Sequence, residues 1–380
     1  GGPRRPGRGR ARAGGARGRV TGAMLELVAE PRRMTFLDPQ SGAPVTRGAE
    51  LRVDPLTGET ARVFDFPIRV WPAPDLEALA RQTRDTCPFC PERLERATPR
   101  FPARLFPEGR LREGTMVVVP NHLPYDLVCA VAVLGPRHLV RLPEMEPDWL
   151  AAALALAQRF HRALAARSPA AAWRSVNWNF MPPSGGSLVH PHLQLVAGDR
   201  PYRFVRTLLE AGRAYRTRTG RTYWADLLEL ERRQPARLVG ATGPWTWLTA
   251  FAPRGRFFEL LALHERAATF EELAPEELAA LAAGLARALR ALDALGFWAF
   301  NLTVASAADP QEASFRVQLR LTPRLALPPT GMSDVSFPFS QGEFLVFYRP
   351  EAVAARLRAA FAGAPAAAAT PPGEAAGAPS

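Results

Sequence analysis

The stretch His190-Pro191-His192-Leu193-Gln194 places two imidazoles and a carboxamide at alternating positions. Apolar residues on both sides predict an extended segment, in which side chains at i, i+2 and i+4 point to one face of a strand. Next-but-one side chains on a strand lie about 7 Å apart, so the two histidines and the glutamine can serve one site without the imidazoles pairing directly. A polar strand edge with two solvated histidines would show the same pattern. The other histidines and the cysteines therefore have to be considered.

Cys87-Pro88-Phe89-Cys90 brings two thiols together on a tight turn. Such a pair suits tetrahedral zinc, which then needs two further ligands from distant sequence. A redox role is the alternative, but no thioredoxin-like strand-helix unit surrounds the motif. The histidines that could complete a metal site are His122, His138, His161, His190, His192 and His264. His161 falls inside a predicted helix as an ordinary surface or core residue, and His122, beside a loop asparagine, is a weaker ligand candidate than His138.

Composition describes a protein able to bury a core, since 47% of the 380 residues are hydrophobic and 22% are charged. No apolar run reaches the length of a membrane span. The formal charge is +12, but seven arginines between Arg4 and Arg19 account for the excess, and without them the charge is +5. We therefore expect no specific nucleic-acid binding. Three cysteines, an odd number, argue against a secreted disulfide framework and predict a reducing, cytoplasmic location.

Hydrophobic periodicity predicts a partly repeated order of elements. The predicted strands are 61–70, 115–119, 127–134, 175–180, 245–251, 257–263 and 315–321, and the predicted helices are 149–167, 202–218 and 275–295. His138 and His264 each follow a strand in their own half. Residues 1–23, rich in Gly, Pro, Arg and Ala, are predicted to be disordered and to be upstream sequence read through before Met24. Residues 362–380 form an Ala/Pro/Gly tail that cannot build a core.

Four motifs in order resemble galactose-1-phosphate uridylyltransferase and its relatives, the nucleotidylyltransferase branch of the histidine-triad superfamily. They are Cys-Pro-Phe-Cys-Pro at 87–91, Val-Pro-Asn at 119–121, Pro-Arg-His at 136–138 and Ser-x-x-His-Pro-His-x-Gln at 187–194. The resemblance implies an α+β fold of two histidine-triad half-barrels, each a mostly antiparallel sheet with packed helices, forming one unit. The implied halves are 24–215, with the zinc and the catalytic histidine, and a degenerate 216–361.

The resemblance also implies a role for each matched residue. The implied ligands of one structural zinc ion are Cys87, Cys90, His138 and His190. His192 resembles the family's nucleophile, and Gln194 resembles the glutamine that hydrogen-bonds the transferred phosphoryl group. The implied substrate-binding residues are Asn121 near the nucleotide, Asn179 near the active site, Gly185, Gly186 and Ser187 at a phosphate, and Arg69 at the distal phosphates.

Chemistry explains why these residue types suit nucleotidyl transfer. A neutral imidazole is both a good nucleophile at neutral pH and a good leaving group from phosphorus. Its other ring nitrogen must donate to a fixed acceptor, which the resemblance predicts to be a backbone carbonyl. Zinc on His190 would hold the strand rigid without touching phosphate. Donors for the developing negative charge would come from Gln194, Ser187 and backbone N–H groups around 185–186.

The second half departs from the family pattern at three places. The family's second H-x-H is matched here by Gln318 and Arg320, so we expect no second metal. A family glutamate falls on Leu208, and an acid that grips the sugar falls on Pro338. The nucleotide-transfer half therefore matches the family, whereas the acceptor half does not.

The sequence thus predicts a homodimeric enzyme that moves a nucleotidyl group between a nucleoside diphosphate sugar and a sugar phosphate through a nucleotidyl-histidine, as uridylyltransferases of galactose metabolism do. One alternative is a phosphorylase or hydrolase of the same superfamily, acting on ADP-sugars or dinucleoside polyphosphates. Another is a zinc-stabilised nucleotide-binding protein without turnover, although a binder has no need of the intact His192 and Gln194. A nucleic-acid-binding role depends on the arginine-rich tail alone.

Overall fold

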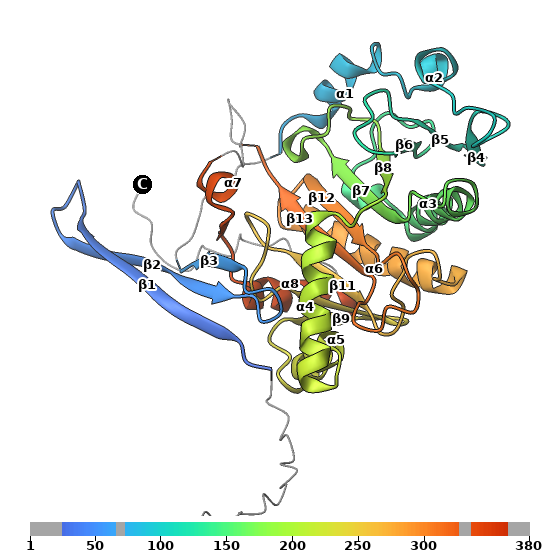
Figure 1. The fold of residues 1–380 in the computed structure, drawn as a ribbon. Helices are drawn as coiled ribbons and strands as arrows, with labels where there is room; N and C mark the ends of the chain where they lie inside the picture. Colours follow the sequence, from blue (N-terminus) through green and yellow to red (C-terminus); the bar gives the residue numbers. More distant parts are fainter. Residues whose placement is uncertain (1–24, 66–72, 327–335, 364–380) are drawn as a thin grey trace, which may run out of the picture.

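A computed structural model describes residues 25–65, 73–326 and 336–363, and a ten-stranded sheet lies at its centre (Figure 1). The strands of this sheet follow the order β4-β5-β6-β8-β7-β12-β13-β11-β10-β9, and every neighbouring pair is antiparallel. A smaller sheet has the order β1-β2-β3-β14, with β14 parallel to β3. The predicted α+β class is confirmed. The predicted tails, 1–23 and nearly all of 362–380, lie outside the described residues.

The strands are β1 (Val28–Leu37), β2 (Pro44–Val53), β3 (Thr60–Phe64), β4 (Leu111–Glu113), β5 (Met116–Pro120), β6 (Val128–Val133), β7 (Trp173–Phe180), β8 (His192–Gly198), β9 (Leu238–Thr242), β10 (Trp245–Thr249), β11 (Leu260–His264), β12 (Ala299–Ala305), β13 (Gln318–Arg324) and β14 (Phe344–Val346). The α-helices are α1 (Leu76–Arg84), α2 (Pro91–Ala97), α3 (Pro147–Arg167), α4 (Arg203–Thr219), α5 (Tyr223–Arg233), α6 (Pro275–Ala294), α7 (Phe337–Gln341) and α8 (Pro350–Phe361). Two short 3-10 helices are η1 (Leu142–Glu144) and η2 (Pro182–Ser184).

The large sheet is symmetrical about the contact between β7 and β12. Moving outward, the first half runs β7-β8-β6-β5-β4 and the second runs β12-β13-β11-β10-β9. Helix α3 connects β6 to β7 just as α6 connects β11 to β12, and the two helices pack side by side. This arrangement confirms the internal repeat predicted from element order. The two halves share one continuous sheet, because β7 and β12 pair with Asn179 opposite Asn301.

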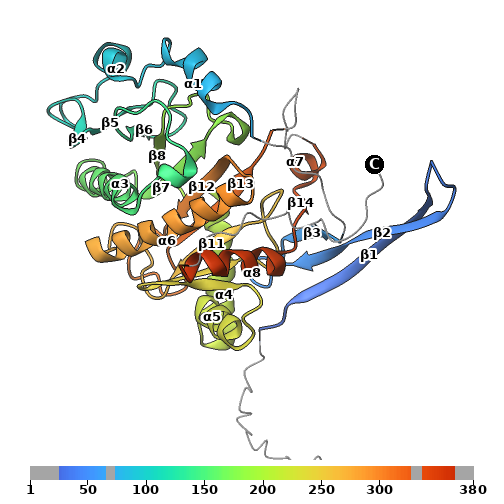
Figure 2. The ribbon, with the colours of Figure 1, turned by 180° about the vertical axis from the view of Figure 1, so that it is seen from behind.

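The two faces of the large sheet carry different helices (Figures 1 and 2). Helices α3, α6 and α8 cover one face, where they bury an extensive apolar core that includes Trp178, Trp247 and Phe300. Gly284 of α6 permits this close packing, since a Cβ there would lie 2.3 Å from the Trp247 ring. Helices α4 and α5 pack on the other face, over the second half. Within the described residues, no helix is both long and apolar enough to cross a bilayer.

Several elements of the fold were not predicted from the sequence, among them β1, β2, β4, β9, β12, β14, α5 and α8. Strands β1 and β2 pair over their full length as a hairpin that projects from the body (Figure 1). The β1 sequence has no two-residue alternation and contains Pro31, and every residue of it is exposed. Strand β12 was also missed, because a short apolar run such as this one does not distinguish a strand from a buried helix segment.

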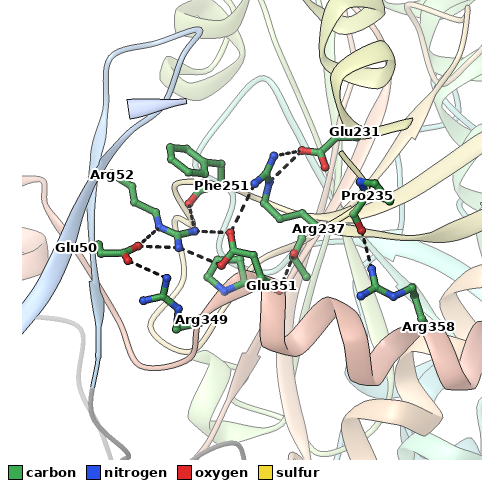
Figure 3. A network of polar contacts seen from close by, with 11 residues as sticks. Glu50, Arg52, Glu231, Pro235, Arg237, Phe251, Arg349, Glu351 and Arg358 are labelled. Atoms are coloured by element: carbon green, nitrogen blue, oxygen red, sulfur yellow. Dashed lines mark hydrogen bonds and ion pairs between the residues drawn. The ribbon is translucent and has the colours of Figure 1, made fainter. Parts of the chain in front are cut away.

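A cluster of buried ion pairs fastens the small sheet to the large one (Figure 3). Arg52 of β2 donates to both carboxylate oxygens of Glu351 on α8, at 2.9 and 3.0 Å, and also to Glu50. The guanidinium groups of Arg52 and Arg237 both pack on the ring of Phe251, at 4.9 and 5.3 Å from its centroid. Because only 2% of Arg52 is exposed, this charge depends on its partners for solvation.

We predict that Arg52→Ala lowers the free energy of unfolding by about 3 kcal/mol, because it removes the buried cation that Glu50 and Glu351 share and leaves them only Arg349 and Arg237. Urea unfolding followed by circular dichroism measures the change. Arg32→Ala is the matched control on the same hairpin, since the Arg32–Glu30 pair is half exposed and should contribute less than about 0.5 kcal/mol. Equal effects of the two substitutions would contradict this account.

Candidate active site and metal centre

Four buried side chains from distant parts of the chain meet at one point. Ligand atoms of Cys87, Cys90, His138 and His190 all lie within 4.8 Å of one another. The Cys90 Sγ is 3.4 Å from Nδ1 of His138 and 3.8 Å from Nδ1 of His190. The two cysteines come from the turn before α2, while His138 follows β6 and His190 precedes β8. This cluster could hold a metal ion.

The second nitrogen of each imidazole is held by a hydrogen bond. His190 Nε2 donates to the carbonyl of Gly135 at 2.8 Å, which leaves Nδ1 with its lone pair. His138 Nε2 lies 3.0 Å from Thr83 Oγ1, and that hydroxyl donates its own hydrogen to the Leu79 carbonyl. Both histidines therefore present an unprotonated Nδ1 toward the cysteines. Metal-binding histidines show this same arrangement of outer hydrogen bonds.

Burial sets the charge state of the cluster. Desolvation, with a further effect from Cys87, raises the pKa of the Cys90 thiol to about 11. Desolvation lowers the pKa of His190 to about 4, and it also lowers the pKa of His138. The imidazoles are thus ready to bind a cation, and a divalent ion would stabilise the thiolates. Two sulfur and two nitrogen donors fit a closed tetrahedral zinc site, which would act by holding the chain in place.

The structure corrects one expectation about the central motif. Strand β8 begins at His192, and His190 lies in a bend before it instead of on the same strand. Pro191 between them has no N–H to donate, so the regular ladder starts only after it, although its carbonyl accepts from Leu134. The bend turns His190 toward the cysteines, whereas His192 and Gln194 keep the strand alternation and share a face.

His192 is held in one tautomer. Its Nδ1 donates to the backbone carbonyl of His190 at 2.8 Å, which is the kind of acceptor expected from the sequence. The other nitrogen, Nε2, therefore carries the lone pair. Burial lowers the pKa of His192, so the ring is neutral at physiological pH. The Phe89 ring packs against it with centroids 5.2 Å apart, and the side chain is largely buried.

A cavity of about 530 Å³ lies beside β8, on the sheet face that carries α4. Its polar lining includes Asn177, Asn179, Gln194, Asn301 and Thr303, and its aromatic lining comes from Tyr125, Tyr202 and Phe204. His192 is two residues before Gln194 on the same strand face, but only Gln194 of the two is among the residues that line the cavity. The sequence missed Asn177, Asn301 and Thr303. The spacing of Asn177 and Asn179 within one strand could have indicated a polar face.

The loop between β7 and β8 has an unusual backbone. Met181 has φ 70° and ψ 160°, a conformation that is almost restricted to glycine, although its side chain is buried. Gly185 has φ 82°, and a Cβ on Gly186 would lie 2.5 Å from the Asn179 carbonyl oxygen. Gly185 thus allows the left-handed turn, and Gly186 lets the loop pack tightly against β7. The next residue, Ser187, is exposed.

Other residues implied by the resemblance lie in different surroundings. Asn121 lies in the loop directly after β5, where its Oδ1 accepts from the N–H of Leu123. Arg69 lies outside the described residues. In the second half, Arg320 donates to Glu259 and to Gln318, each at 2.8 Å, and forms a buried polar cluster. Leu208 packs in the apolar core under α4.

Pro338 lines a second pocket, of about 360 Å³, which adjoins the first because both are lined by Arg254. The other arginines that line it are Arg203, Arg256 and Arg324. Arg254 is fixed between the rings of Phe204 and Phe344, with centroid distances of 4.2 and 5.4 Å. Among the described residues that line this pocket, none is acidic.

Comparison with known proteins gives one relative in sequence and several in structure. A protein of Archaeoglobus fulgidus described as uncharacterized is 30% identical over 311 residues, which cover 81% of this chain and 91% of that protein. An ADP-glucose phosphorylase from Arabidopsis thaliana, solved with bound ADP-glucose, has a TM-score of 0.63 at 18% identity, covering 81% of this chain and 98% of that one. A uridylyltransferase structure has a TM-score of 0.60 at 22% identity, covering 82% and 98%. No protein-family model matches the chain.

The chain has the fold of these galactose-1-phosphate uridylyltransferase-like structures. Within this class, the chain belongs to the same family as the Archaeoglobus fulgidus protein.

We predict about one metal ion per chain in protein purified without chelators. Cys87→Ser should lower the metal content several-fold and lower the melting temperature, because structural zinc contributes roughly 10 kcal/mol or more in small metal domains. Elemental analysis by mass spectrometry measures the content. Cys129→Ser is the control, since Cys129 is also buried but lies outside the cluster. Metal-free wild-type protein, or equal content in both variants, would contradict the prediction.

Proposed function

We propose that this protein is a nucleotidyltransferase that works through a covalent nucleotidyl-histidine on His192. The observation that carries the proposal is the buried hydrogen bond from His192 Nδ1 to the His190 carbonyl, which leaves Nε2 as a neutral nucleophile. The low-dielectric surroundings lower its pKa, so the reactive form is the populated one. A pure nucleotide binder has no need of this arrangement.

The proposed reaction has two displacements at one phosphorus atom. In the first, His192 Nε2 attacks the α-phosphorus of a nucleoside diphosphate sugar, a P–N bond forms, and the P–O bond to the sugar phosphate breaks. In the second, a phosphate oxygen of the acceptor attacks the same phosphorus, the P–N bond breaks, and the imidazole is regenerated. No proton has to move when both phosphates are ionised. A neutral imidazole serves both steps as nucleophile and leaving group.

The surrounding residues have separate proposed roles. Zinc held by Cys87, Cys90, His138 and His190 would fix the chain next to His192, since the bound His190 supplies the carbonyl that orients the nucleophile. Gln194 would donate to the phosphoryl oxygens as negative charge develops. We also propose that Asn179, Asn121, Ser187 and the backbone at Gly185 and Gly186 contact the substrate, with Arg69 at the distal phosphates.

The pocket proposed for the acceptor favours a second candidate function that uses the same nucleotidyl-histidine chemistry. The pocket that contains Pro338 is lined by four arginines, and guanidinium groups bind phosphate oxygens through paired hydrogen bonds. Inorganic phosphate would then be the acceptor, and the protein would be a phosphorylase of ADP-sugars or dinucleoside polyphosphates. Product analysis with inorganic phosphate and with hexose 1-phosphate as competing acceptors separates the phosphorylase from the hexose 1-phosphate uridylyltransferase.

We predict that His192→Gly lowers turnover by at least about 10⁴-fold, because it removes the covalent path. Gln194→Ala removes a single donor and should cost about 10²–10³-fold. Metal content should be retained in both variants. Added imidazole should restore part of the reaction of His192→Gly with an activated nucleotide, because it can occupy the vacated space.

Steady-state assays with UDP-glucose and ADP-glucose measure these effects. His122→Gly is the matched control, because His122 is exposed in the loop after β5 and should change turnover by less than about threefold. Activity of His192→Gly within tenfold of wild type would exclude the covalent mechanism and favour direct displacement.

A further inference from the structure

A chain of four polar side chains crosses the junction between the two halves of the sheet. Arg324 Nε on β13 donates to Asn301 Oδ1 on β12 at 2.6 Å. Asn301 Nδ2 donates to Asn179 Oδ1 on β7 at 2.8 Å. Asn179 Nδ2 in turn donates to Gln194 Oε1 on β8 at 3.4 Å. We call these four residues the amide relay.

The partners of Asn301 Oδ1 and Nδ2 determine which atom of each amide in the relay donates and which accepts. A guanidinium group has donors and no acceptor, so the Asn301 atom facing Arg324 must be its oxygen. The Asn301 amide nitrogen also contacts the carbonyl oxygen of Ser184 at 2.8 Å, and a carbonyl can only accept. The orientation of a side-chain amide is otherwise ambiguous, but here both neighbours require the same one.

The orientation of the Asn301 amide determines the orientation of the Asn179 and Gln194 amides. Asn179 must accept from Asn301 through Oδ1, so its own NH₂ group faces Gln194. Gln194 therefore accepts through Oε1, and its NH₂ group is the part that remains for a ligand. An amide turned the other way would present an oxygen to the phosphoryl oxygens and repel them. The relay thus determines whether Gln194 attracts or repels an anionic group.

We propose that Arg324 is a positioning residue that acts through Asn301 and Asn179 to hold the Gln194 NH₂ group toward the transferred phosphoryl group. Arg324 lines the second pocket but not the cavity that contains Gln194, so it acts on the transferred phosphoryl group through the other members. The positive charge shortens the first bond of the relay and polarises those that follow. The identity of the phosphoryl ligand rests on the proposed function, whereas the orientation of Gln194 does not.

The orientation can be measured without any substrate. In protein labelled with ¹⁵N only in glutamine side chains, the NH₂ resonance of Gln194 is assigned by its loss in Gln194→Ala. Arg324→Met should shift this resonance, because Asn301 loses the donor that fixes its direction. Arg324→Lys should leave it close to its wild-type position, since an ammonium group also only donates. Arg206→Met is the control, because Arg206 is exposed on α4 and lines neither pocket.

A binding experiment tests the consequence for the nucleotide. AMP and UMP are the probes, since their phosphate occupies the transferred position and they cannot react further. Gln194→Ala and Arg324→Met should each weaken binding by roughly tenfold or more, as expected for a hydrogen bond to a charged group. The double variant should bind about as weakly as either single one, because both substitutions remove the same donor. Arg324→Lys should recover most of the affinity.

The two experiments separate the possible failures. An unmoved Gln194 resonance in Arg324→Met, or an equal shift in Arg324→Lys, would overturn the relay whatever the nucleotide data show. Fully additive losses in the double variant would also overturn it. If the resonance shifts as expected but wild-type protein binds neither AMP nor UMP, the relay holds and the proposed function fails.

Discussion

The antiparallel pairing of β7 with β12 is the interaction on which the rest of the structure depends. It joins two five-stranded halves into one sheet and brings Asn179 opposite Asn301. One face of that sheet is closed by α3, α6 and α8 over a large apolar core. The other face carries a row of amide side chains that line the main cavity. A shift of this pairing by one residue would turn those amides into the apolar core, so the register is strongly specified.

The cysteine-histidine cluster and His192, the proposed nucleophile, are structurally coupled. His190 supplies Nδ1 to the cluster and its backbone carbonyl to His192. A metal ion at the cluster would therefore immobilise the acceptor that selects the tautomer of His192, even though the ion lies outside the proposed chemistry. The second half carries Gln318 and Arg320 where the first has its histidines. It contributes Asn301 to the lining of the same cavity, and Arg324 donates to Asn301 from outside that lining. The two halves thus share one candidate site, to which each half contributes different residues.

The candidate site could be predicted from the sequence where its residues lie in short motifs. The resemblance implied that Cys87, Cys90, His138 and His190 form one cluster, and the structure brings these four residues together. Strong periodicity predicted α3 and α6 within one or two residues. The hairpin of β1 and β2 could not be predicted, because the fully exposed β1 lacks the alternation that burial imposes. The amide relay could not be predicted from the sequence either. Asn301 is 122 residues from Asn179, and only the register of β7 on β12 places them together.

The most direct test of the central claim is the mass of the intact protein after brief exposure to ADP-glucose or UDP-glucose, followed by mapping of the modified peptide at neutral and at acidic pH. The account predicts a gain equal to one nucleotidyl group, located on His192, stable at neutral pH and lost in acid as expected for a phosphorus–nitrogen bond. Addition of a phosphate acceptor should remove the group and release the transferred product. Turnover of the nucleotide sugar without any such adduct, or an adduct on another residue, would contradict it.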